Sequence, residues 1–82
     1  MNRVAQVLPR AEHLLEVTFV DGLKALINPR PYLDKGIAAE LLAPERFAMV
    51  SVEEGGGISW PNGFDVCPKF LRELAEKRQA AA

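Results

Sequence analysis

The chain has 82 residues, of which 49% are hydrophobic and 26% are charged, so it is long enough for one compact domain and too short for two. Ten Lys and Arg residues against eleven Asp and Glu residues leave a net charge of −1, which excludes a strong attraction to nucleic acid or anionic lipid. Apolar runs span only a few residues, against the ~20 that a membrane helix needs, and the N-terminus lacks a signal-peptide core, so we expect a cytoplasmic protein.

The chain has one cysteine and one histidine, which leaves little material for catalysis or metal binding. Cys67 cannot form an internal disulfide, and we expect its thiol to pack as a small apolar group. His13 follows Glu12 in a polar connection, where we expect a solvated side chain rather than a catalyst. The sequence therefore predicts no cofactor, no metal site and no catalytic residues.

Two runs near the N-terminus have the pattern of paired β-strands. Residues 3–8 alternate in hydrophobicity and are followed by Pro9, which lacks a backbone donor, so we expect an edge strand. Residues 14–20 are rich in β-branched and aromatic side chains and predict a second strand. Asp21-Gly22 favours a two-residue type I′ hairpin turn into a third strand, which Asn28-Pro29 ends.

The type I′ turn predicts the register of this hairpin, with Val20 opposite Leu23 and Val17 opposite Leu26. The residues predicted on the core face are Leu15, Val17, Phe19 and Leu26. The residues predicted on the other face are Glu16, Thr18, Val20, Leu23, Ala25 and Ile27. This second face is too apolar to be fully solvated, so we expect a helix, the N-terminal strand or another subunit to cover part of it.

The second half of the chain predicts helices and a second pair of strands. Residues 32–42 have apolar spacings near a helical period and predict a short, irregular helix, and Pro44 opens a further helical turn. Residues 47–52 and 58–60 predict strands, joined through Glu53, Glu54 and three glycines that we expect to form a loose, flexible hairpin connection rather than a phosphate loop. Pro61-Asn62-Gly63 predicts a type I turn with a bulge, after which the chain resumes at Phe64.

A final helix begins at Pro68. The side predicted to be buried carries Leu71, Leu74, Ala75 and Arg78, and residues 79–82 are expected to fray. Together these elements predict one α+β domain over residues 1–82. Its order is three strands, a short helix, two strands and a final helix packed on a small antiparallel sheet.

Trp60, Asn62 and Asp65 are the candidate site residues in the second half of the chain. Trp60 either packs in the core or forms an exposed contact for a partner, and the packing interpretation is favoured. Asp65 either makes a capping or turn hydrogen bond or serves as a functional acid, and the capping or turn hydrogen bond is the simpler interpretation. A small enzyme would need Asp65, Asn62, Tyr32 and His13 to converge in one pocket.

The chain resembles a family of small bacterial proteins, domain-of-unknown-function family 2442, over nearly its whole length. The resemblance lies in Val17-x-Phe19-x-Asp21-Gly22, Pro31-x-Leu33, Phe47, Val50 and, most specifically, Trp60-Pro61-Asn62-Gly63-x-Asp65-x-x-Pro68. It implies a compact α+β domain without an established activity or cofactor. Some relatives carry an additional helix-turn-helix, and many are encoded beside another small protein in an arrangement similar to toxin–antitoxin pairs.

These observations predict a non-enzymatic protein–protein interaction module that binds a second copy of itself or a co-encoded partner, as an antitoxin-like or accessory protein. The predicted contact is the half-apolar sheet face or an exposed sheet edge. The predicted interaction residues are Leu23, Ala25, Ile27, Trp60, Asn62 and Asp65. The alternative is a DNA-associated regulatory accessory, which would need scattered cations to gather on one surface. Those cations are Arg3, Arg10, Lys24, Arg30 and Lys35.

Overall fold

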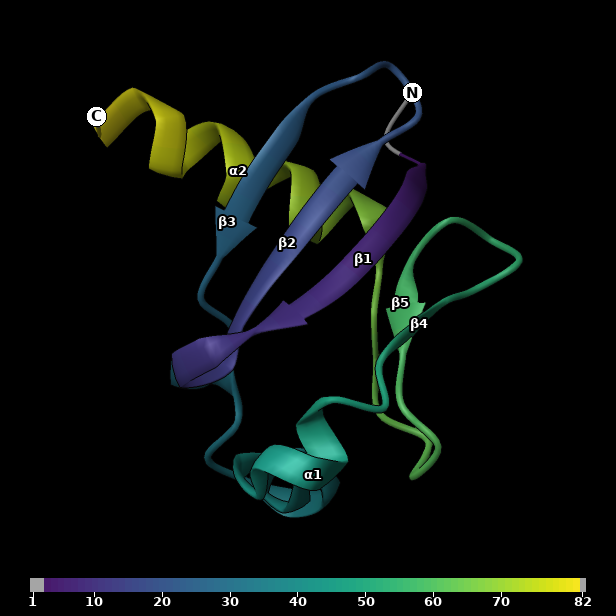
Figure 1. Cartoon of the computed structure of the whole chain (residues 1–82), viewed down its shortest axis with the longest axis vertical. Coiled ribbons are helices and arrows are strands. Elements are labelled where there is room, and N and C mark those ends of the chain that lie inside the picture. The colour runs from purple at the N-terminus through teal and green to yellow at the C-terminus, as the bar shows by residue number, and fades with distance from the viewer. Residues whose placement is uncertain (1–2, 82) are drawn as a thin grey trace.

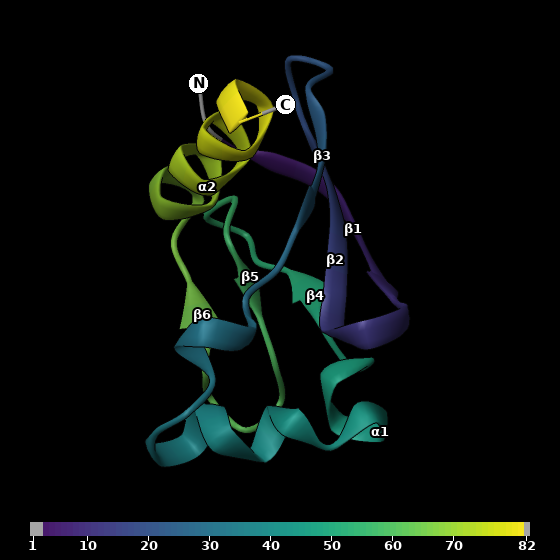
Figure 2. The ribbon, with the colours of Figure 1, turned by 90° about the vertical axis from the view of Figure 1, so that its left-hand side faces the viewer.

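The computed structural model describes residues 3–81 and has an α+β fold with two small antiparallel sheets and a C-terminal helix (Figure 1). The first sheet has the order β1-β2-β3, formed by Val4–Arg10, Leu14–Phe19 and Lys24–Ile27. The second has the order β4-β5-β6, formed by Ser51–Val52, Ile58–Ser59 and Asp65–Val66. The final helix α2, Pro68–Ala81, lies behind the first sheet in Figure 1 and to one side of it in Figure 2.

Short helical segments connect the strands. The 3₁₀ helix η1 (Ala11–His13) joins β1 to β2, and the 3₁₀ helices η2 (Arg30–Tyr32) and η3 (Gly36–Leu42) precede the single-turn helix α1 (Pro44–Phe47). The predicted irregular helix is therefore present as 3₁₀ structure. The strand predicted to begin at residue 47 is wrong in its first part, because the Phe47 N–H donates to the Ala43 C=O at 3.0 Å and closes the α1 turn.

The β2–β3 turn differs from the predicted two-residue turn. The Phe19 N–H donates to the Leu23 C=O at 2.8 Å, and the Gly22 N–H donates to the Phe19 C=O at 2.9 Å, so the loop contains three residues. Gly22 has φ +96° and Asp21 is not among the positive-φ residues, whereas a type I′ turn needs positive φ at both of its central positions. The turn is therefore type I with a glycine bulge.

The additional turn residue shifts the register by one and exchanges the faces of β3. Val17 pairs with Ala25, and Ala25 and Ile27 lie in the core with 8% and 2% exposure. Leu26, predicted in the core, is 40% exposed on the opposite face. Leu23 is half-buried and packs against the core. The prediction that Leu23, Ala25 and Ile27 point away from the core is therefore wrong, since a one-residue slip inverts every side chain of a strand.

The same three-residue turn connects β5 to β6, as predicted. The Trp60 N–H donates to the Phe64 C=O at 2.9 Å, and the Gly63 N–H donates to the Trp60 C=O at 3.0 Å. Gly63 has φ +97°, which places it at the bulge position.

The three-glycine segment between β4 and β5 forms this turn for a third time. The Glu53 N–H donates to the Gly57 C=O at 2.8 Å, and the Gly56 N–H donates to the Glu53 C=O at 2.9 Å. Gly56 has φ +96°, and both Gly56 and Gly57 are buried. The Gly56 C=O also accepts the Val4 N–H at 2.8 Å, which fastens this turn to β1. The segment is thus a tight, packed turn rather than the loose connection predicted.

One hydrophobic core lies between the first sheet, α2 and the second half of the chain. Its largest fully buried side chains are Phe19, Leu15, Ile27, Leu33, Leu41, Ile58, Leu71 and Val17. On α2, Leu71 and Ala75 are buried and Leu74 is half-buried, as predicted, while the Arg78 side chain lies outside the described residues. The helix continues to Ala81, so fraying of its end stays a prediction. No helix in residues 3–81 has both the length and the apolar character to cross a membrane.

Candidate functional site

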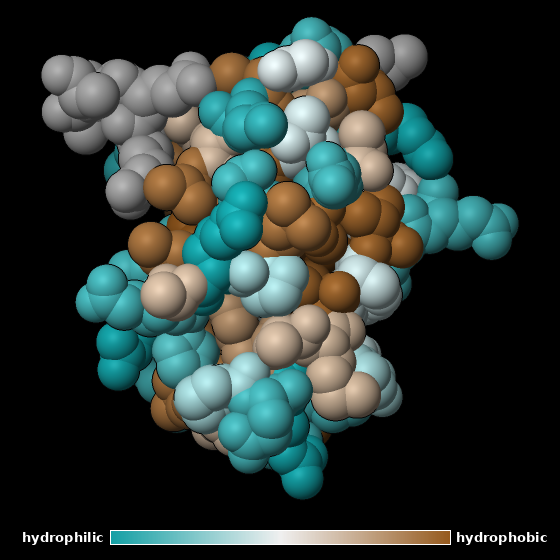
Figure 3. All heavy atoms as spheres, in the orientation of Figure 1, coloured by the Kyte–Doolittle hydropathy of each residue, from teal (hydrophilic) through white to brown (hydrophobic). Residues whose placement is uncertain are grey.

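The outer face of the first sheet, turned toward the viewer in Figure 1, combines leucines with charged residues. Leu8 on β1, Glu16 on β2 and Leu26 on β3 form one cross-strand row across this face. Leu8 is half-buried, and Leu26 is exposed. We call this surface the outer sheet face, and its residues are Gln6, Leu8, Arg10, Leu14, Glu16, Thr18, Lys24 and Leu26. In the same orientation, Figure 3 shows hydrophobic patches between hydrophilic ones.

A central carboxylate organises the charges of the outer sheet face. Arg10 Nη2 lies 2.9 Å from Glu16 Oε1, and Lys24 Nζ lies 3.7 Å from Glu16 Oε2. The hydrogen bond from Arg10 lowers the pKa of Glu16 below its ordinary value of 4.5. Glu16 is therefore ionised at neutral pH, and its charge is compensated on two sides. Arg10 and Lys24, two of the cations considered for DNA contact, are both engaged with it.

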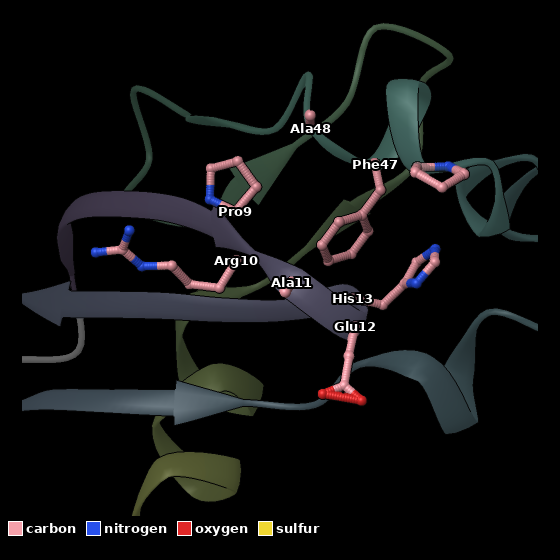
Figure 4. Close-up of a pocket in the computed structure, with 8 residues that line it drawn as sticks. Pro9, Arg10, Ala11, Glu12, His13, Phe47 and Ala48 are labelled. Carbon is pink, nitrogen blue, oxygen red and sulfur yellow. The ribbon is translucent and has the colours of Figure 1, made fainter.

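A groove of about 380 Å³ lies between the β1–β2 connection and α1 (Figure 4). The apolar part of its lining consists of Pro9, Ala11, Pro44, Phe47 and Ala48. Arg10, Glu12 and His13 also border it. Figure 4 shows the His13 and Phe47 rings beside each other, while Arg10 and Glu12 point away from the Phe47 ring. The groove is within the size range of small-ligand pockets, but two of its charged side chains are directed elsewhere.

His13 has a structural environment that the sequence did not indicate. Its Nε2 lies 2.8 Å from the Leu42 C=O, and its ring centroid is 4.9 Å from that of Phe47. Because a carbonyl oxygen only accepts, Nε2 carries the proton of this hydrogen bond. The predicted solvated side chain is therefore wrong, since His13 is half-buried and joins η1 to η3 and α1. Glu12 and His13 have φ values of 61° and 60°, an unfavourable conformation for residues with a Cβ.

Trp60 belongs to the core, with 3% exposure, which is the packing alternative of the sequence analysis. Its Nε1–H donates to the Phe47 C=O at 2.8 Å, and its ring is tilted against Phe47 and Phe64 with centroids 6.0 and 5.6 Å apart. Trp60 also borders a small hollow of about 50 Å³, together with Arg46 and Met49. Trp60 is therefore held by the fold and is a poor candidate for a partner contact.

Asn62 and Asp65 have different roles. Asn62 Nδ2 donates to the Ile37 C=O at 2.9 Å, and its Oδ1 accepts the Phe64 N–H at 3.0 Å, so this side chain fastens η3 to the β5–β6 turn. Asp65 is exposed on β6, and among residues 3–77 no side-chain hydrogen bond or ion pair to it occurs. The predicted capping or turn hydrogen bond of Asp65 is therefore not seen.

The groups that an enzyme would need each have a separate neighbour. His13 contacts Leu42, Asn62 contacts Ile37, and Tyr32 stacks edge-on against Phe70 with centroids 5.1 Å apart. Cys67 is exposed rather than packed, which corrects the prediction for its thiol. Among the described residues, His, Cys, Asp and Glu side chains form no group of three that could hold a metal ion.

Leu26 was predicted on the core face instead of the outer sheet face because the turn at Asp21-Gly22 was predicted as type I′. A signal was present, since Val20-Asp21-Gly22 and Pro61-Asn62-Gly63 share an Asx-Gly pair in the same positions. Both Asx side chains accept the N–H two residues later, at 3.3 Å for Leu23 and 3.0 Å for Phe64. Treating the two segments alike would have given the three-residue turn, and with it Leu26 on the outer face.

Comparison with known proteins agrees with the resemblance seen in the sequence. No curated protein and no solved structure matches the chain. A family model matches residues 4–77, which include every strand and most of α2. The chain therefore belongs to the family described as "protein of unknown function (DUF2442)".

Proposed function

We propose that the protein is a non-enzymatic protein–protein interaction module that binds its partner through the outer sheet face. The observation that carries this proposal is the cross-strand row Leu8–Glu16–Leu26 on the side of the sheet away from the core. Leu26, at the end of this row, is 40% exposed. A solvated face of an antiparallel sheet normally alternates to polar residues, and three leucines in this small area depart from that pattern.

The chemistry of the outer sheet face suits a moderately strong protein contact. Full burial of an exposed leucine contributes about 1.5–3 kcal/mol, so Leu26 with the half-buried Leu8 and Leu14 supplies an apolar centre. The charged groups around that centre favour a defined orientation of the partner more than they add affinity. Glu16 already has Arg10 as a close partner, which reduces the cost of covering it.

The partner is a second copy of the chain or a different protein, such as the product of a neighbouring gene in an antitoxin-like or accessory arrangement. The net charge of −1 opposes neither partner and gives no support to a DNA-binding role. Arg3 also donates to the Glu54 C=O at 2.8 Å, so a third candidate DNA-contacting cation has an internal partner. Cytoplasmic location stays a prediction.

The proposal is tested by site-specific photo-crosslinking in cells of the native host. A photoreactive phenylalanine analogue replaces Leu26 in one strain and Met49 in another, because Met49 is also exposed, at 55%, and lies outside the outer sheet face. We expect defined crosslinked species from position 26 and none of the same species from position 49. The proposal fails if position 26 gives no crosslinked protein, or if both positions give the same products.

A further inference from the structure

The two edges of the first sheet differ in how far their backbone groups are satisfied. Edge strand β1 is protected, because its Val4 N–H donates to the Gly56 C=O and its register shifts between Val4 and Gln6. Pro9 lies opposite Leu15, and the backbone groups of Leu15 are directed toward β3. Pro9 therefore directs its backbone away from β2, toward the open edge, where it has no N–H to donate to an added strand. Irregularities and prolines of this kind oppose the addition of another strand.

Edge strand β3 lacks these protections. Hydrogen-bonded and non-hydrogen-bonded residue pairs alternate along an antiparallel hairpin. Because the Phe19 N–H donates to the Leu23 C=O, this pair is hydrogen-bonded, and Leu23, Ala25 and Ile27 direct their backbone groups toward β2. Lys24 and Leu26 therefore direct their N–H and C=O groups away from the sheet. Within residues 3–81 these groups have no backbone or side-chain hydrogen-bond partner. In Figure 2, where this side faces the viewer, no other helix or strand lies in front of β3.

We propose that β3 is a dimerisation edge, on which a second copy of the chain places its own β3 antiparallel about a two-fold axis at Leu26. The two sheets then form one continuous six-stranded sheet, and the unpaired groups of Leu26 bond to those of the other Leu26. This inference rests on the proposed function and names its partner. A strand is the only element whose backbone satisfies a row of alternating donors and acceptors.

Among the antiparallel pairings of two copies, the positions of Lys24 and Leu26 on β3 favour this register. With Leu26 opposite Leu26, each Lys24 lies opposite Asn28 of the other copy, and the two Lys24 side chains are roughly 14 Å apart. An axis at Lys24 would set two ammonium groups directly opposite, and an axis at Ala25 would press each Lys24 against a leucine. The axis at Leu26 avoids both arrangements and joins apolar to apolar.

This pairing also extends the outer sheet face. The row Leu8–Glu16–Leu26 of one copy continues directly into the same row of the other, because Leu26 ends the row at the open edge. The Leu26 side chain, with 40% exposure, becomes covered at the axis. Each Glu16 keeps its own Arg10 at 2.9 Å, so the junction leaves that ion pair in place.

The test is disulfide trapping combined with sedimentation of the purified full chain. The native thiol of Cys67 is exposed, so all trapping variants carry Cys67→Ser. Facing residues of a hydrogen-bonded antiparallel pair have Cα atoms about 5.5 Å apart, within the roughly 4.4–6.8 Å that a disulfide spans. We expect Leu26→Cys to form a covalent dimer on mild oxidation. The Lys24→Cys and Val20→Cys variants should run as monomers on non-reducing gels, because in this register neither cysteine lies opposite the same cysteine of the other copy.

Sedimentation of the unmodified chain should show a monomer–dimer equilibrium. Leu26→Lys should weaken it by at least roughly tenfold through lost burial and like-charge contact, whereas Val20→Lys, also at an exposed position, should not. Circular dichroism of each variant confirms folding. A chain that stays monomeric at millimolar concentration overturns the inference, as does trapping of Lys24→Cys as fast as Leu26→Cys. If the chain is monomeric and position 26 crosslinks to a different protein in cells, this inference fails while the proposed function stands.

Discussion

Alanine substitution at three consecutive glycines, Gly55, Gly56 and Gly57, should give three different changes in stability. The structure places them in one turn but in different surroundings. A Cβ at Gly55 meets nothing within 4 Å, and φ there is not positive. A Cβ at Gly56 would lie 2.9 Å from Arg3 Cγ and 3.1 Å from Arg3 Cα, at φ +96°. A Cβ at Gly57 would lie 2.5 Å from the Val66 carbonyl oxygen.

These surroundings set the expected magnitudes. Gly55→Ala should be neutral or stabilise by about 0.4–1 kcal/mol, because it only restricts the unfolded chain. Gly56→Ala combines a left-handed residue, which costs about 1–2 kcal/mol, with crowding against Arg3, the residue before β1, for a total of about 2–4 kcal/mol. Gly57→Ala should cost about 1–3 kcal/mol, because a backbone oxygen must move to admit the methyl group.

The series is measured by urea unfolding of the three variants beside the unsubstituted chain, with fluorescence of the buried Trp60 as the signal. Losses of this size are a large part of the about 4–12 kcal/mol expected for a domain of this length. Gly55→Ala is the matched control for composition and position. Small, equal effects at all three glycines would show that the segment is the loose connection that the sequence suggested, and the largest loss at Gly55 would contradict the packing described for this turn.

Three further substitutions test other contacts. A hydrogen bond from Arg72 lowers the pKa of Asp21 below its ordinary value of 3.8. The ionised Asp21 therefore stabilises the fold at pH values above 3.8, and this stabilisation is lost as the pH falls through the lowered pKa of the folded state. Asp21→Asn should therefore be less stable than the unsubstituted chain in urea at about pH 7, and the difference should shrink at about pH 2.5, whereas an equal difference at both would refute the linkage. Glu12→Gly should stabilise by about 0.5–1 kcal/mol in thermal unfolding by relieving φ 61°, while Glu45→Gly in α1 should destabilise. Trp60→Phe should cost about 2–4 kcal/mol in urea unfolding, because the Phe47 C=O loses its donor in the core, and a loss under 1 kcal/mol would show that this bond is dispensable.

The fold class was predictable because several independent local signals agree. Pro61 presets φ for a type I turn, and Gly63 then supplies the positive φ of the bulge, so that reversal was predicted correctly. Pro68 likewise marked the start of α2 correctly. In the β2–β3 turn, Val20 occupies the position that Pro61 occupies in the β5–β6 turn, and valine does not favour a particular turn type. The sequence was therefore interpreted as a type I′ turn, and the register predicted from it was wrong by one residue.

The surroundings of His13 were not predictable, because they depend on tertiary contacts. The Leu42 C=O that binds its Nε2 is 29 residues away in sequence, and Phe47, which stacks on it, belongs to a helix of one turn. Neither Glu12 nor His13 is a glycine, so the contacts of the folded chain hold both residues at positive φ. The groove beside them has the same origin, since its two walls come from separate segments.

The family-specific segment and the proposed binding surface are different parts of the molecule, and this has a practical consequence. Trp60 and Asn62 use their polar groups inside the fold, on Phe47 and Ile37, so changing them alters stability and function together. Leu26 has 40% exposure, and its substitution by a polar residue should change stability by only about 0.5 kcal/mol. A binding or dimerisation defect in a folded Leu26 variant therefore reports on the interface itself, whereas the same defect in a Trp60 variant would report only that the domain had unfolded.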